Sequence, residues 1–186
     1  MSQLFEVFTN TVKQQVASVT DEATLLKSVS DSLKTLLGKP GWLPPAYTKP
    51  RDDRYAQYPL YVAPDGSFSI VSFVWLPGQQ TPVHDHTVWG VVGIHQGVER
   101  TEAFREIDGK LQVVKTIDAT VGEVGAVSPQ IGDVHRVGNV SDDVAVSIHV
   151  YGGDIGNINR HVYDESSGQA SGFVSGYEPV EPLLPA

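Results

Sequence analysis

Short segments rich in β-branched and aromatic residues dominate the chain from about Tyr58 onward. Runs such as SFSIVSFVWL, LQVVKTI and VAVSIHVY alternate with stretches that contain glycine, proline, aspartate and asparagine. Several short strands separated by turns indicate an all-β sandwich or barrel. A parallel sheet is disfavoured, because none of the intervening segments is long enough for the crossover helix that parallel strands need. The sequence therefore predicts a mainly β fold.

The N-terminal part of the chain has a different pattern, in which apolar residues recur at helical spacing. Two helices are expected here. The second should begin near Thr20, whose hydroxyl would cap a first turn that contains Asp21 and Glu22. Gly38 then ends this helix. We expect the helical segment to pack on the outside of the β structure.

The chain has 186 residues, a length that fits one structural domain. Changes in composition divide it into four expected parts. These are N-terminal helices over 1–38, a proline-rich connector over 39–57, a β-barrel over 58–163 and an irregular tail over 164–186.

The composition excludes several classes of function. The net charge of −9 argues against nucleic acid as a partner, since phosphate recognition needs a basic patch. There is no cysteine, so any metal must be held by nitrogen and oxygen ligands. No apolar stretch has the length of a signal peptide core or a membrane span, so we expect a cytoplasmic protein with no membrane partner. The oligomeric state stays open.

Three histidines form the first candidate site. His84 and His86 are two positions apart, and alternate side chains of a strand point to the same face, so both rings can approach one point. His135 lies in a second segment of similar character. Imidazole is a common ligand of iron, nickel, copper and zinc. Asp85 should point to the opposite face and so should not complete the ligand set.

The residues around these histidines resemble the two sequence motifs of the cupin superfamily, which consists of small metal-binding β-barrels. The first motif matches at Gly78, His84, His86, Gly90 and Gly97, and the second at Pro129, Gly132, His135 and Asn139. The resemblance implies a cupin barrel, also called a double-stranded β-helix or jelly roll, with an N-terminal helical segment. A glutamate usually stands at the position of Gly90 in this superfamily. Three neutral imidazoles without that carboxylate favour an anionic, chelating substrate, because the metal keeps its full charge.

A second polar group is expected on a later strand. Ser147, His149 and Tyr151 alternate with three aliphatic residues in VAVSIHVY, so they line one face of the strand. Three hydrogen-bonding side chains in an apolar core would cost free energy unless they bond to one another or to a site. An exposed strand face is the alternative interpretation.

Together, the HDHT string at the first pair and the S-x-H-x-Y string resemble the cysteine dioxygenase family of thiol dioxygenases. These enzymes use non-haem Fe(II) to add both atoms of O₂ to a small thiol, which gives a sulfinic acid. The resemblance implies that Fe(II) is held by His84, His86 and His135. It also implies an outer hydrogen-bond relay formed by Ser147, His149 and Tyr151, with Tyr151 near the open iron positions as a catalytic residue.

Two departures from the family pattern bear on the substrate. Animal-type members form a Cys–Tyr thioether whose cysteine aligns with Gly90, and this chain has no cysteine. Cysteine-specific members bind the substrate carboxylate with an arginine, where this chain has Gln57. That glutamine resembles the bacterial 3-mercaptopropionate dioxygenases, so 3-mercaptopropionate is the favoured substrate and cysteine the alternative. A neutral amide needs additional charge to hold a carboxylate, and Arg160 is the expected source; a surface position is its alternative interpretation.

Two other functions remain open from the sequence. Another three-histidine cupin oxygenase would act on a non-thiol substrate, and a non-catalytic barrel would bind a metal or ligand without turnover. The ligands alone do not select iron, since zinc, nickel and copper also bind three imidazoles.

Overall fold

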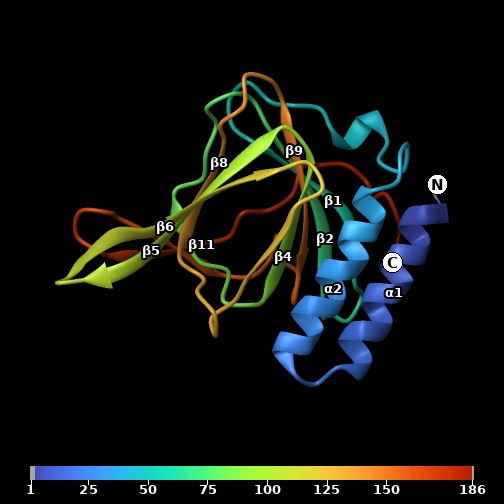
Figure 1. Ribbon diagram of the computed structural model, residues 1–186, viewed down its shortest axis with the longest axis horizontal. Helices are drawn as coiled ribbons and strands as arrows, with labels where there is room; N and C mark the ends of the chain where they lie inside the picture. The colour runs from blue at the N-terminus through green and yellow to red at the C-terminus, as the bar shows by residue number, and fades with distance from the viewer. Residues whose placement is uncertain (1–2, 186) are drawn as a thin grey trace.

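The computed structural model describes residues 3–185 and consists of two helices followed by a β structure (Figure 1). Helix α1 spans Gln3–Ser18 and α2 spans Glu22–Leu37. Asp21, rather than Thr20, caps α2, because its carboxylate accepts a 2.8 Å hydrogen bond from the Thr24 amide. The helix thus begins one residue later than the sequence indicated. A short 3₁₀ helix, η1 (Pro45–Tyr47), lies in the connector.

Eleven strands form two antiparallel sheets within residues 3–185. The first has the order β1-β2-β9-β4-β7 and the second the order β11-β10-β3-β8-β5-β6. The strands are β1 (Ala56–Val62), β2 (Ser69–Trp75), β3 (Val83–His84), β4 (Gly90–Gln96), β5 (Val98–Ile107), β6 (Lys110–Thr120), β7 (Val124–Val127), β8 (His135–Asn139), β9 (Ala145–Tyr151), β10 (Arg160–Tyr163) and β11 (Ala170–Phe173). The chain crosses repeatedly between the two sheets, and the predicted mainly β cupin barrel with an N-terminal helical segment is confirmed.

Two boundaries differ from those expected. Strand β1 begins at Ala56, inside the expected connector, and β11 lies inside the tail that was expected to be irregular. Strand β11 pairs along its whole length with β10. Its sequence, Ala-Ser-Gly-Phe, has little of the β-branched character that marks strands, so pairing with the sheet edge decides its conformation.

The helices cover the outer face of the first sheet, as Figure 1 shows for α2 beside β4. Val146, Ile148 and Val150 of β9 point into this helix–sheet core. At Gly93 of β4, an added Cβ would lie 2.6 Å from Leu37 Cδ1, so the absence of a side chain lets α2 approach the sheet. The opposite face of β9 points into the barrel, and the site is built there.

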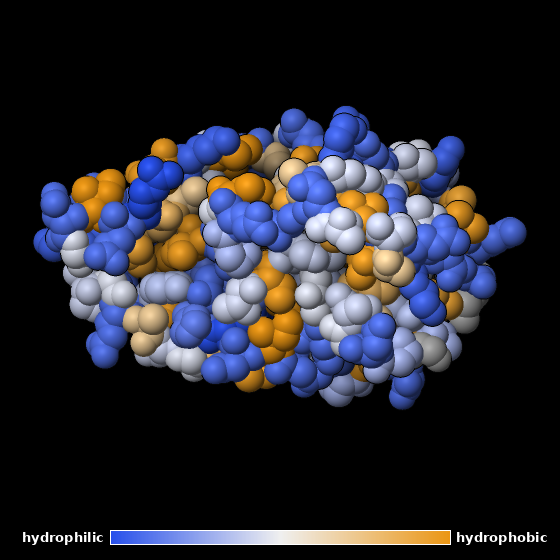
Figure 2. Space-filling model, turned by 90° about the horizontal axis from the view of Figure 1, so that it is seen from below, coloured by the Kyte–Doolittle hydropathy of each residue, from blue (hydrophilic) through white to orange (hydrophobic). Residues whose placement is uncertain are grey.

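The surface carries no single dominant apolar region on the face in Figure 2, where hydrophilic residues surround separate apolar patches. The β5–β6 hairpin projects from the barrel (Figure 1). Among the described residues, no helix has both the length and the apolar character needed to cross a membrane.

Candidate metal centre

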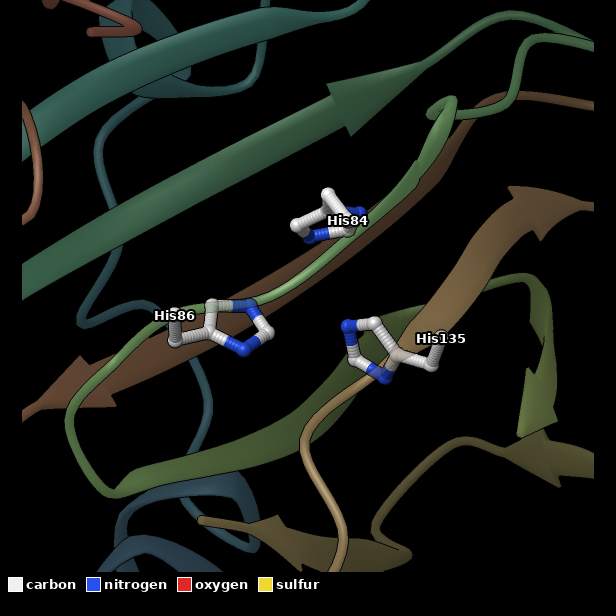
Figure 3. Close-up of side chains that lie close together, drawn as sticks. All are labelled: His84, His86 and His135. Carbon is white, nitrogen blue, oxygen red and sulfur yellow. The ribbon is translucent and has the colours of Figure 1, made fainter. Parts of the chain in front are cut away.

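The second sheet brings the three predicted histidines together. Strand β3 ends at His84 and pairs with β8 in the register His84↔His135, while His86 follows two residues after His84. One ring nitrogen of each residue lies within 4.8 Å of the others. All three side chains are buried, and Figure 3 shows their rings turned toward a common point.

Outer hydrogen bonds fix two of these rings. His84 Nδ1 lies 3.0 Å from the Pro82 carbonyl oxygen, and His86 Nδ1 lies 2.7 Å from Asp133 Oδ1. Both partners are acceptors, so Nδ1 carries the proton and Nε2 keeps its lone pair for a metal. Metal-bound histidines commonly have such carboxylate or carbonyl partners. No sequence motif marks Asp133, which approaches His86 only through the fold.

Electrostatics also favours metal binding by these histidines. Burial lowers the pKa of His84 to about 4 and the pKa values of His86 and His135 well below the usual range. The imidazoles are therefore neutral, which is the ligand form. His135 Nδ1 is buried and has no hydrogen-bond partner among residues 3–185. The donor set fits a first-row divalent metal.

Asp85 points away from the three histidines, as its position between His84 and His86 on the chain predicted. Its carboxylate accepts hydrogen bonds of 2.9 Å from the His161 amide and 2.8 Å from the Tyr163 hydroxyl. It is not part of the cluster of possible ligands in the described chain.

The structure also brings the three residues of β9 into one connected chain. His149 lies between the other two, with Nε2 2.7 Å from Ser147 Oγ and Nδ1 2.8 Å from the Tyr151 hydroxyl. The Tyr151 ring stacks on His86 with ring centroids 5.2 Å apart. All three side chains are buried, so the alternative of an exposed strand face is wrong.

Glu99 and Trp75 extend this chain of hydrogen bonds. The Ser147 hydroxyl lies 2.7 Å from Glu99 Oε2, and the Trp75 indole N–H donates to Ser147 Oγ at 3.3 Å. Neither residue was singled out from the sequence, because β5 also contains the exposed Glu106 and nothing in the pattern marks Glu99 as buried.

Gly90 lies directly beside the Tyr151 ring. A Cβ added at this position would be 3.0 Å from both Cδ1 and Cε1 of Tyr151 and 3.3 Å from Val127 Cγ2. Any side chain at this position would therefore press its Cβ against the Tyr151 ring.

We expect Gly90→Ala to displace the Tyr151 ring, because the strand backbone at Gly90 and Val127 cannot retreat freely. The overpacking should cost about 1–3 kcal/mol of unfolding free energy. Denaturant unfolding measures this change. As a control, Gly125→Ala has no atom within 4 Å of the added Cβ and should be tolerated better. Equal stability of the two variants would contradict the close packing.

A small cavity lies over the three histidines and opens to solvent. Aromatic side chains form much of its wall, and no aspartate or glutamate of residues 3–185 lines it. The residues that line it include Tyr55, Gln57, Phe73, Trp75, His84, His86, His135, His149, Tyr151, Arg160 and Phe173. Both expected substrate-binding residues thus reach the same cavity as the histidines.

Gln57 and Arg160 differ in how much hydrogen-bonding capacity they have free. Gln57 Nε2 donates to Ser175 Oγ at 3.1 Å and to the Gly176 carbonyl at 2.9 Å, so both of its N–H groups are used. Arg160 donates from Nη2 to Ser175 Oγ at 2.8 Å, while its buried Nε has no partner in the described chain. Ser175 accepts a hydrogen bond from each of the two side chains. It lies in a segment that was expected to be irregular, so no sequence pattern indicated this contact.

Arg160 is a buried cation rather than a surface residue. Its residue exposure is 4%, and its guanidinium lies 4.6 Å from the centre of the Phe173 ring. No carboxylate among residues 3–185 forms an ion pair with it. A buried charge without a counterion is costly, and an anion that entered the cavity would compensate it.

Comparison with known proteins identifies the family. The model of the family "Cysteine dioxygenase type I" matches residues 6–166. Among solved structures, the chain is similar to an uncharacterized conserved protein with a double-stranded β-helix domain from Klebsiella pneumoniae, with 12% identity, 72% of this chain and 96% of that chain covered and a TM-score of 0.49. It is also similar to an RmlC-like cupin protein from Desulfovibrio desulfuricans, with 25% identity, coverage of 61% and 95% and a TM-score of 0.45. On the match over residues 6–166, this chain belongs to the cysteine dioxygenase type I family.

Proposed function

We propose that this protein is an Fe(II)-dependent thiol dioxygenase that oxidises a small thiol carboxylic acid, with 3-mercaptopropionate preferred over cysteine. The thiol and O₂ are the two substrates. Two S–O bonds form, the O–O bond breaks, and the thiol proton is released or retained by the sulfinic acid product. Sulfur loses the four electrons that O₂ gains, so no further reductant is needed.

The observation that carries this proposal is the unpaired Arg160 guanidinium in the cavity above the three histidines. A thiol carboxylic acid presents a carboxylate at one end and sulfur at the other. Arg160 would bind the carboxylate with charge-assisted hydrogen bonds, which are stronger than those of neutral groups. The sulfur end would then lie toward His84, His86 and His135.

The three histidines would hold the metal, and their neutral nitrogens suit Fe(II). When bound, Fe(II) would supply the redox chemistry by which O₂ reacts with the thiol. The protein contributes by excluding water from the cavity and by orienting the groups around the metal. Tyr55, Phe73 and Trp75 line the cavity with aromatic surface and reduce the access of water. Asp133 keeps the His86 ring in one orientation.

The absence of an acid in the cavity wall supports 3-mercaptopropionate over cysteine. Both molecules have a thiol and a carboxylate, and cysteine adds an ammonium group. No aspartate or glutamate among the described residues lines the cavity, so that ammonium would have no counterion. The free-energy cost of removing the ammonium from water would then not be compensated. Gln57 would contribute its free amide oxygen as an acceptor near the substrate, since its two donors are engaged.

We expect Tyr151→Phe to keep the metal but to slow thiol oxidation roughly tenfold, which corresponds to one lost hydrogen bond. Tyr151 lines the cavity, and its hydroxyl lies 2.8 Å from His149 Nδ1. Metal content and initial rates of O₂ uptake measure the two effects. Tyr47→Phe is the control, because its hydroxyl bonds to the Glu181 carbonyl outside the cavity. Unchanged uptake by Tyr151→Phe would remove Tyr151 from the reaction.

O₂ consumption by the Fe(II)-loaded protein with three thiols tests the function directly. We expect uptake to be fastest with 3-mercaptopropionate, slower with cysteine and slowest with cysteamine, which lacks the carboxylate. One O₂ should disappear per thiol, with a sulfinic acid as product. A preference for cysteine would contradict the substrate assignment. No uptake with any of the three would contradict the activity and favour a non-thiol oxygenase or a binding protein.

A further inference from the structure

Glu99 of β5 is a buried acid that contacts Ser147, at the opposite end of the β9 hydrogen-bond chain from Tyr151. Its residue exposure is 2%, and no cation among residues 3–185 forms an ion pair with it. Its hydrogen-bonding partner is the Ser147 hydroxyl at 2.7 Å. A structural acid would ordinarily be exposed or paired, so this carboxyl group calls for a specific role.

The surroundings of Glu99 contain few other charges. Its strand neighbours on β6 and β8 are Ala119 and Asn139, and neither is ionisable. From β2 the nearby group is the indole of Trp75. From β9 the ionisable groups are His149 and Tyr151, which are connected to Glu99 through Ser147. Arg100, the next residue along β5, is on the outer face and pairs with Asp118.

We propose that Glu99 is the outer end of this relay and that its protonation state sets the direction of every hydrogen bond as far as Tyr151. This inference rests on the proposed function in one respect, the use of the Tyr151 hydroxyl as a hydrogen-bond donor in the cavity. The four side chains form an unbroken series with separations of 2.7, 2.7 and 2.8 Å.

When Glu99 is ionised, it can only accept, so the Ser147 O–H points to it. Ser147 Oγ then accepts from His149 Nε2–H, and the unprotonated Nδ1 accepts the Tyr151 O–H. The phenol proton is thereby turned toward His149 and away from the cavity. Trp75 also donates to Ser147 Oγ, whose two lone pairs accept both bonds.

When Glu99 is protonated, each bond reverses. The carboxylic O–H donates to Ser147 Oγ, and the Ser147 O–H donates to His149 Nε2. His149 Nδ1–H then donates to the Tyr151 oxygen, which frees the phenol proton to point into the cavity. Ser147 still accepts from Trp75, so its bonding is complete in both arrangements. Only this second arrangement allows Tyr151 to donate to a bound substrate.

Both arrangements are accessible near neutral pH. Burial raises the pKa of Glu99 to about 7, while the Ser147 hydroxyl and the Trp75 indole oppose this rise. The proton is present below this pH and lost above it, so the Tyr151 donor is available at lower pH. If only the protonated form is active, the rate should fall by up to tenfold per pH unit on the alkaline side.

The tautomer of His149 tests the inference without measuring activity. We expect ¹⁵N NMR of the full chain loaded with diamagnetic Zn(II) to show Nδ1–H at pH 5.5 and Nε2–H at pH 8.5. The signals are assigned by their loss in His149→Gln. In Glu99→Gln, whose amide stays neutral, the tautomer should not change with pH. Glu106→Gln, which removes an exposed acid of the same strand, should behave like the unmodified protein.

The outcomes separate this inference from the proposed function. A single tautomer over the whole pH range in the unmodified protein would overturn the role of Glu99, even if the thiol were oxidised. A tautomer change that persists in Glu99→Gln would overturn it as well. If the His149 tautomer changed with pH only when Glu99 was present, but no thiol was oxidised, the role of Glu99 would be supported. The proposed dioxygenase activity would then be contradicted. In the active enzyme, the alkaline fall in O₂ uptake should disappear in Glu99→Gln and remain in Glu106→Gln.

Discussion

Replacing His86 by alanine is expected to abolish thiol oxidation and to weaken metal binding by more than 100-fold. The variant keeps two of three imidazoles and opens a gap at a position that is 1% exposed. Loss of an outer partner of a metal ligand typically reduces affinity by about 10- to 100-fold, and loss of the ligand itself should exceed this. Competition with a chelator measures the affinity, and metal analysis after dialysis measures occupancy.

Two further variants calibrate this result. Asp133→Asn weakens the hydrogen bond to His86 Nδ1, so metal affinity should fall within the range of about 10- to 100-fold. His95→Ala removes a histidine that packs edge-on against Trp42, away from the cluster, and should leave metal binding unchanged. If His86→Ala bound metal as tightly as the unmodified protein, the three-histidine site would be wrong.

The histidine cluster could be predicted because it depends on local geometry and on one cross-strand pairing. The two-residue spacing of His84 and His86 fixes their common face, and the antiparallel pairing of β3 with β8 brings His135 opposite His84. The outer partners could not be predicted in the same way. Asp133 reaches His86 through a turn, and no periodicity in the sequence reports such a contact.

The same distinction explains the remaining parts of the fold. The helices and β9 have strong periodic patterns of apolar residues, and these patterns reflect burial directly. Strand β11 and Ser175 have no such pattern, because their positions depend on pairing with β10 and on contacts with Gln57 and Arg160. Whether Gln57 or Arg160 can bind a substrate depends on which of them has free hydrogen-bond donors. Only the three-dimensional packing shows this.

Ser175 changes the balance between Gln57 and Arg160 as binding groups for a carboxylate. It accepts one hydrogen bond from each, and Gly176 accepts the second N–H of Gln57. A carboxylate would have to displace these partners to be bound by Gln57. The Arg160 guanidinium has a free, buried N–H and a full positive charge, so it should supply most of the binding energy.

Replacing Arg160 by methionine should therefore raise the KM for 3-mercaptopropionate by about 10- to 100-fold. Hydrogen bonds to charged groups contribute about 1.5–3 kcal/mol, and each 1.4 kcal/mol corresponds to a factor of ten. Methionine keeps an unbranched apolar side chain beside Phe173 but removes an unpaired buried charge, so the unfolding free energy should not fall. Steady-state O₂ uptake and thermal unfolding measure the two effects.

Cysteamine provides the internal control for this variant, because it has a thiol and no carboxylate. Its rate of oxidation should be unchanged in Arg160→Met, or higher, since its ammonium is no longer repelled by the guanidinium. Arg100→Met, which removes an arginine that pairs with Asp118 on the exposed β5–β6 hairpin, should alter neither substrate. Equal KM values for 3-mercaptopropionate in Arg160→Met and the unmodified protein would place the carboxylate elsewhere. A loss that is equal for both thiols would instead indicate that Arg160 shapes the metal site, because only a carboxylate contact distinguishes the two molecules.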